Sequence, residues 1–83
     1  MNKKHLTIIN QWLRQNQGLG WNLEEPYITK KESHNHSSIN LKTLENCCIE
    51  QNQLCLAMKG EYMIWLVDDT ITISYEPLHP LFT

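Results

Sequence analysis

The stretch that decides the fold is QLCLAMKGEYMIWLVDDTITISYE, residues Gln53–Glu76. Three apolar and β-branched segments in it are separated by Lys59-Gly60 and by Asp68-Asp69, residue types that favour tight turns. The pattern predicts an antiparallel three-strand meander with strands at residues 54–58, 61–67 and 70–75.

Strand side chains alternate between faces, so two-residue turns would assign every residue of this meander to one face. The face expected to form the core carries Cys55, Ala57, Tyr62, Ile64, Leu66, Ile71, Ile73 and Tyr75. The second face carries Leu54, Leu56, Met58, Met63, Trp65 and Val67 on two strands, and Thr70, Thr72 and Ser74 on the third. Because both sides of the central strand are apolar, each side needs a cover.

An N-terminal helix is predicted from Lys4 to Gln17, capped by Asn2 or Thr7 and ended by the glycines that follow it. A helix of this length extends about 20 Å, enough to cover one face of the sheet but not both. The helix residues expected to contact Ile64, Leu66 and Ile73 are Leu6, Ile9 and Leu13.

The middle of the chain is less regular. Pro26 precedes a short edge strand around Tyr27–Lys31, and the all-polar Glu32–Ser38 is expected to be a loop. Ile39–Ile49 fits a strand by alternation or a short helix by its spacing of leucines. Its β-branched start favours the strand, with Glu50–Gln53 as a hairpin loop into the meander.

We therefore predict an α+β fold in which an N-terminal helix packs on a four- or five-stranded antiparallel sheet. Residues 1–83 are expected to form a single small domain, because so short a chain cannot bury two separate cores.

Composition argues against several partners. The formal net charge is −2 and the basic residues form no stripe, so we expect no nucleic acid partner. No segment reaches the length of a membrane span or has the uniformly apolar character of a secretory signal. Three cysteines, two of them adjacent, do not suggest a disulfide framework. These features predict a cytoplasmic protein with reduced thiols.

The sequence has no catalytic grouping. His34 and His36 with the three cysteines are the only metal-ligand residue types gathered in the sequence, but adjacent Cys47 and Cys48 would point to opposite sides of a strand. Asp68-Asp69 is most simply a hairpin tip. We predict no enzyme activity, no cofactor, no metal and no small-molecule substrate.

The remaining candidate is an apolar contact surface. Either the strand Tyr27–Lys31 or the tail Leu78–Phe82 covers the second sheet face within the monomer, or a protein partner or second copy does. We favour a partner or homodimer, with Trp65 as the main anchor. The predicted partner-binding residues are Met63, Trp65, Val67, Leu54, Leu56, Trp21 and Tyr27.

The expected function is that of a small intracellular protein-binding protein. It would inhibit or neutralise a larger partner by occupying its surface, as an immunity protein, an antitoxin or an anti-defence inhibitor does. The alternative is a dimeric secretion-chaperone or adaptor-like protein that captures an extended segment. A small Cys/His metal-binding protein is the third hypothesis.

Overall fold

One helix and two antiparallel sheets make up the computed structural model, which describes residues 1–31 and 36–75. The expected α+β class, with an N-terminal helix on antiparallel strands, is confirmed; the strands number seven and are divided between two sheets. The helix is α1 (Lys3–Gln15). The three-stranded sheet contains, in spatial order, β1 (Trp21–Glu24), β2 (Tyr27–Lys31) and β3 (His36–Asn40). The four-stranded sheet contains β4 (Leu44–Glu50), β5 (Gln53–Met58), β6 (Tyr62–Val67) and β7 (Thr70–Ser74).

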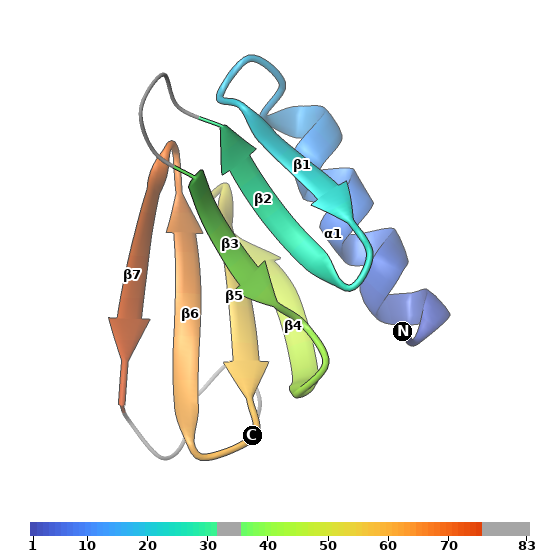
Figure 1. The fold of residues 1–83 in the computed structure, drawn as a ribbon, viewed down its shortest axis with the longest axis vertical. Coiled ribbons are helices and arrows are strands. Elements are labelled where there is room, and N and C mark those ends of the chain that lie inside the picture. Colours follow the sequence, from blue (N-terminus) through green and yellow to red (C-terminus); the bar gives the residue numbers. More distant parts are fainter. Residues whose placement is uncertain (32–35, 76–83) are drawn as a thin grey trace.

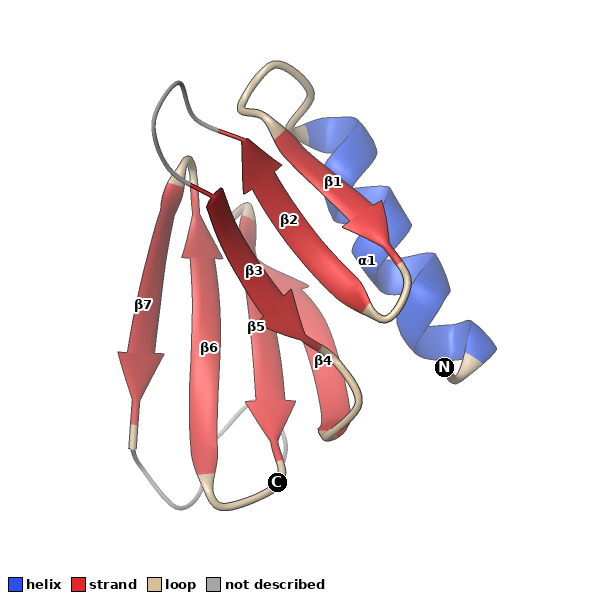
Figure 2. Cartoon of the chain, in the orientation of Figure 1, coloured by secondary structure: helices blue, strands red, loops and turns tan. Residues whose placement is uncertain are grey.

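The two sheets lie one across the other, with the helix along one side (Figure 1). α1 contacts β1 of the three-stranded sheet and β4 and β5 of the four-stranded sheet. Figure 2 shows β3 crossing in front of the four-stranded sheet, while β7 lies at the side farthest from the helix. Together, α1 and the three-stranded sheet therefore lie mainly over β4, β5 and β6.

The helix begins where its N-terminal cap predicts. The Asn2 side chain accepts a hydrogen bond of 2.7 Å from the Lys4 backbone N–H, which satisfies one of the donors left free at a helix start. The last helical residue is Gln15, two residues earlier than expected. Gly18 and Gly20 then take positive φ angles in the turn toward β1.

The turn between β5 and β6 corrects the predicted faces of the meander. Met58 pairs with Tyr62, so the loop contains three residues rather than two, and both Gly60 (φ 101°) and Glu61 (φ 62°) are left-handed. One extra loop residue moves every side chain of β5 to the opposite face relative to β6. The β5 residues that share the core face with Ile64 are Leu54, Leu56 and Met58. Cys55 and Ala57 lie on the outer face with Met63, Trp65 and Val67.

The other two hairpins of the four-stranded sheet have two-residue loops. Asp68-Asp69 is the predicted tip between β6 and β7, since Val67 pairs with Thr70. Gln51 and Asn52, both at positive φ, connect β4 to β5. Two central residues with positive φ match the hairpin turn that follows the natural twist of the strands.

Three predictions for the middle of the chain were partly wrong. The strand Tyr27–Lys31 is central in its sheet rather than an edge, because Trp21–Glu24 forms an additional strand beside it. The predicted strand Ile39–Ile49 is two strands, separated by a turn at residues 41–43. The predicted loop Glu32–Ser38 contributes residues 36–38 to β3.

The core lies between the two sheets, and α1 closes one side of it. Ile9, Ile64 and Leu66 take part as expected, but the helix contributes fully buried Trp12 in place of Leu6, and Leu13 is only partly buried. Ile73 stays exposed, which corrects its assignment to the core. The buried apolar residues are Ile9, Trp12, Ile28, Ile39, Leu41, Cys47, Leu54, Leu56, Met58, Ile64 and Leu66.

Polar contacts join α1 to the turn between β4 and β5. The Trp12 indole N–H donates a 2.9 Å hydrogen bond to the Asn52 carbonyl oxygen. The side-chain amides of Asn16 and Asn52 bond each other in both directions, at 3.2 and 3.0 Å. Because Asn16 is buried, losing Asn52 would leave the Asn16 side-chain oxygen without a hydrogen-bond donor. These bonds hold the helix at a defined position along the sheet.

We predict that Leu56→Ala lowers the free energy of unfolding by about 3 kcal/mol, because Leu56 is completely buried and its removal opens a cavity. Ile73→Ala, on the same sheet face but half-exposed, should cost about 1 kcal/mol or less. Urea denaturation monitored by circular dichroism measures both. Equal shifts for the two variants would contradict the observed register of β5 and the exposure of β7.

Candidate functional site

The residues predicted to bind a partner do not form one surface. Leu54 and Leu56 have no exposed area and lie in the core, so they cannot contact a partner of the folded protein. Met63, Trp65 and Val67 share the outer face as predicted, where Met63 is buried and the other two are partly buried. The outer face is thus a smaller candidate surface than the sequence suggested.

The sequence offers two segments that could cover this outer face within the monomer, the strand Tyr27–Lys31 and the tail Leu78–Phe82. The strand Tyr27–Lys31 does not cover it, because Ile28 of that strand packs into the core on the opposite side of the four-stranded sheet. The other candidate cover, the tail Leu78–Phe82, lies outside the described residues. Among the described elements, α1 and the three-stranded sheet both pack on the core side.

Trp21 and Tyr27 lie at opposite ends of the β1–β2 hairpin. The Trp21 indole N–H donates a 2.7 Å hydrogen bond to the Asp68 carbonyl oxygen, and its ring lies 6.5 Å from that of Trp12 between centroids. Trp21 therefore joins the three-stranded sheet to the turn between β6 and β7. Tyr27 is exposed at the start of β2 and remains available for contact.

Lys30 supports the same junction. Its side chain is buried, with Nζ 5.5 Å from the centroid of the Trp21 ring. The ammonium donates a 3.1 Å hydrogen bond to the Asp69 carbonyl oxygen and lies 3.7 Å from the Asp69 carboxylate. A buried ammonium requires such partners, so these contacts anchor the start of β7 to the three-stranded sheet.

Beyond that anchor, β7 and the residue that follows it carry large exposed apolar side chains. Ile71 and Ile73 pair with Leu66 and Ile64, so they face the core side, yet they are 36% and 50% exposed. Tyr75 is 79% exposed, and its ring centroid lies 6.0 Å from that of Tyr62. The sequence placed these residues on the correct face but missed their exposure. The position of β7 as the last strand of a meander was the available signal, because a terminal strand lies at the sheet edge.

The residues with metal-ligand chemistry stay apart. Cys47 points into the core and Cys48 to the outer face, which confirms the predicted divergence of the pair. His34 lies outside the described residues, as does the side chain of His36. No cluster of three or more His, Cys, Asp or Glu side chains suited to a metal occurs within residues 1–31 and 37–75.

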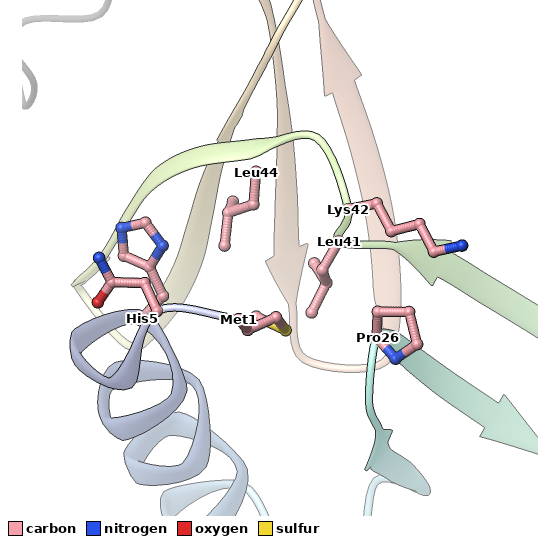
Figure 3. Close-up of a pocket in the computed structure, with 7 residues that line it drawn as sticks. Met1, His5, Pro26, Leu41, Lys42 and Leu44 are labelled. Carbon is pink, nitrogen blue, oxygen red and sulfur yellow. The ribbon is translucent and has the colours of Figure 1, made fainter.

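A pocket of about 460 Å³ opens at the N-terminus of α1 (Figure 3). Figure 3 shows side chains from the helix start, the β1–β2 turn and the β3–β4 turn around it. The lining residues are Met1, Asn2, His5, Pro26, Leu41, Lys42 and Leu44. The titratable side chains of this lining are His5 and Lys42, and Figure 3 shows the Lys42 ammonium directed away from His5.

All three cysteines are free thiols with raised pKa values. Burial raises the pKa of Cys47 to about 11, and it is also the main cause of the upward shifts of Cys48 and Cys55. The neighbouring thiols also shift each other's pKa values, lowering that of Cys48 and raising that of Cys55, while the Cys55 Sγ donates a 3.9 Å hydrogen bond to the Gln53 carbonyl oxygen. Cys48 is the only one of the three that is not buried.

No family model, curated protein or solved structure matches the chain. Within the described residues, no helix is both long and apolar enough to cross a membrane. The interpretation of the site therefore depends on its own chemistry.

We predict that a thiol reagent labels Cys48 first in the native protein, with Cys47 and Cys55 reacting only after unfolding. Cys55 was expected to be the least reactive, and its complete burial supports that order, although it lies on the outer face. Because a raised pKa lowers the thiolate fraction at neutral pH, labelling should accelerate by about tenfold per pH unit between pH 7 and 8.

Thiol titration with and without urea measures the order and the rates. Cys48→Ser is the matched variant and should abolish the native labelling phase. Native labelling of Cys55 as fast as that of Cys48 would contradict the placement.

Proposed function

We propose that this protein is a small protein-binding protein that neutralises or sequesters a larger partner by holding an extended segment of it along β7. The observation that carries the proposal is the exposure of Ile71 and Ile73 on a strand at the edge of the sheet, with Tyr75 exposed directly after that strand.

The edge of β7 supports this mode of binding. No described strand pairs with its outer side, since β7 ends the order β4-β5-β6-β7. With Val67 and Thr70 as the hydrogen-bonded pair that closes the hairpin, Thr72 and Ser74 also bond β6, whereas the amides of Ile71 and Ile73 point outward. Thr70–Ser74 contains no proline or charged residue, the devices that usually protect an edge strand.

The size of the surface favours an extended segment over a globular face. At their exposed fractions, Ile71, Ile73 and Tyr75 offer on the order of 350 Å², well under the ~800 Å² per partner of a standard interface. Strand addition needs less side-chain area, because main-chain hydrogen bonds supply much of the affinity. The favoured ligand is a segment whose alternate apolar residues lie beside Ile71 and Ile73.

A second candidate surface is the outer face around Trp65 and Val67. Both side chains are partly buried there, on the side of the sheet opposite α1 and the three-stranded sheet. Contact through this face corresponds to inhibition by occupying a partner's surface rather than by strand addition. The test of the first proposal distinguishes the two.

We expect Ile73→Lys to abolish binding of the cellular partner, because it places a charge beside the exposed apolar side chains of Ile71 and Tyr75. Asn22→Lys is the control: it adds the same charge at an exposed strand residue, on β1 of the other sheet. Quantitative mass spectrometry of proteins retained by each immobilised variant identifies the partner, and the purified pair is then measured by calorimetry. We predict a loss of affinity of at least about tenfold for Ile73→Lys alone.

Hydrogen exchange of the complex locates the contact. The outward amides of Ile71 and Ile73 should exchange rapidly in the free protein and become protected by the partner. Unchanged exchange at Ile71 and Ile73 in the complex, or binding unaffected by Ile73→Lys, would overturn strand addition. Concentration-dependent dimerisation that Ile73→Lys abolishes would show a second copy on this edge, which also contradicts the proposal.

A further inference from the structure

Cys48 and Cys55 occupy directly opposite positions on neighbouring antiparallel strands. They belong to the outer face of the four-stranded sheet, and neither contributes to the catalytic, metal or binding chemistry considered above. The Cys55 Sγ donates a 3.9 Å hydrogen bond to the Gln53 carbonyl oxygen, and the Cys48 and Cys55 thiols are close enough to shift each other's pKa values. Directly opposite residues on one face of an antiparallel pair are the neighbours whose side chains interact.

The hairpin loop defines the geometry of this pair. Gln51-Asn52 is a two-residue loop closed by Glu50 and Gln53, so the hydrogen-bonded pairs alternate from there, and Cys48 with Cys55 is one of them. The Cα atoms of such a pair are separated by about 5.5 Å. Disulfides span Cα separations of roughly 4.4 to 6.8 Å, so the expected separation of this pair lies within the range that a disulfide bridges.

We propose that Cys48 and Cys55 form a redox-sensitive dithiol that closes to a disulfide across β4 and β5 when the protein meets a peroxide. Cys48 is the thiol that reacts first, because it is partly exposed whereas Cys55 has no exposed area. Cys47 is excluded from the pair, since it points to the core side, where its Sγ lies 3.9 Å from the His5 carbonyl oxygen.

The reaction balances with one peroxide. The Cys48 thiolate attacks one peroxide oxygen, the O–O bond breaks, and the products are the Cys48 sulfenic acid and, after protonation, one water. The Cys55 sulfur then attacks the Cys48 sulfur, the S–S bond forms, and the sulfenic oxygen leaves as a second water with the Cys55 proton. The two thiols lose two electrons and two protons in total, and the peroxide is reduced to two waters.

The bond would alter the candidate outer face. Cys55 is directly opposite Trp65 on β6, so the disulfide forms beside that side chain. Oxidation also covalently links β4 to β5. The dithiol and disulfide forms thus present different surroundings of Trp65 to anything that contacts this face.

The test uses hydrogen peroxide on the full chain, followed by denaturation, alkylation of the remaining thiols and intact mass measurement. All three cysteines lie between Lys42 and Lys59, in one tryptic peptide, so single variants are needed to assign the bond. Cys47→Ser retains the proposed pair and should lose both alkylatable thiols as a monomer. Cys48→Ser retains Cys47 and Cys55, on opposite faces, and should lose thiols at least about tenfold more slowly.

Two further measurements separate the proposal from nonspecific oxidation. In Cys55→Ser, the Cys48 sulfenic acid cannot be resolved and should be captured by dimedone. In denaturing urea, the difference between Cys47→Ser and Cys48→Ser should disappear, because the fold no longer selects the pair. Equal oxidation of the two variants in the native state, or disulfides only between separate chains, would overturn the proposal.

Discussion

The register between β5 and β6 decides what each face of the four-stranded sheet contains. Three residues, Lys59–Glu61, form the loop that connects these strands, and two of them have positive φ. With this register, Leu54, Leu56 and Met58 join Ile64 and Leu66 on one continuous apolar face. A loop shorter by one residue would send the β5 leucines to the outer face and bring a cysteine and an alanine into the core.

The large apolar face on β5 and β6 explains the rest of the architecture. It is wide enough that one helix does not cover it, and the three-stranded sheet supplies the remaining cover through Ile28 and Ile39. Polar contacts then set how the layers align. Asn52, in the turn between β4 and β5, forms hydrogen bonds with α1. The Asp68-Asp69 turn accepts hydrogen bonds from Trp21 and Lys30 of the three-stranded sheet. Both turns lie at the same end of the sheet, so one end is anchored to both layers.

The two candidate functional features lie where this cover ends. β7 lies beyond the helix and the three-stranded sheet, which leaves its core-facing isoleucines exposed and its outer edge without a described strand beside it. The outer face carries the Cys48–Cys55 pair next to Trp65. An edge suited to strand addition and a dithiol on the reverse face of the same sheet are independent of each other, and each has its own chemistry.

The sequence by itself determined the elements that depend on local chemistry. The helix start follows from the Asn2 cap, the meander from its β-branched segments and turn residues, and the opposite directions of Cys47 and Cys48 from strand alternation. The exposed isoleucines of β7 were placed on the correct face for the same reason. These properties depend on residues a few positions apart, which a pattern in the chain reports directly.

Only the tertiary structure decided the face of β5, the second sheet and the exposure of β7. Lys59-Gly60 is compatible with a two- or three-residue loop, and burial of Leu54, Leu56 and Met58 selects the longer one. The pairing of Trp21–Glu24 with Tyr27–Lys31 depends on the core that Ile28 enters. The exposure of Ile71 and Ile73 depends on how α1 and the three-stranded sheet pack on the four-stranded sheet. Each is set by contacts between distant residues, so no local pattern contains it.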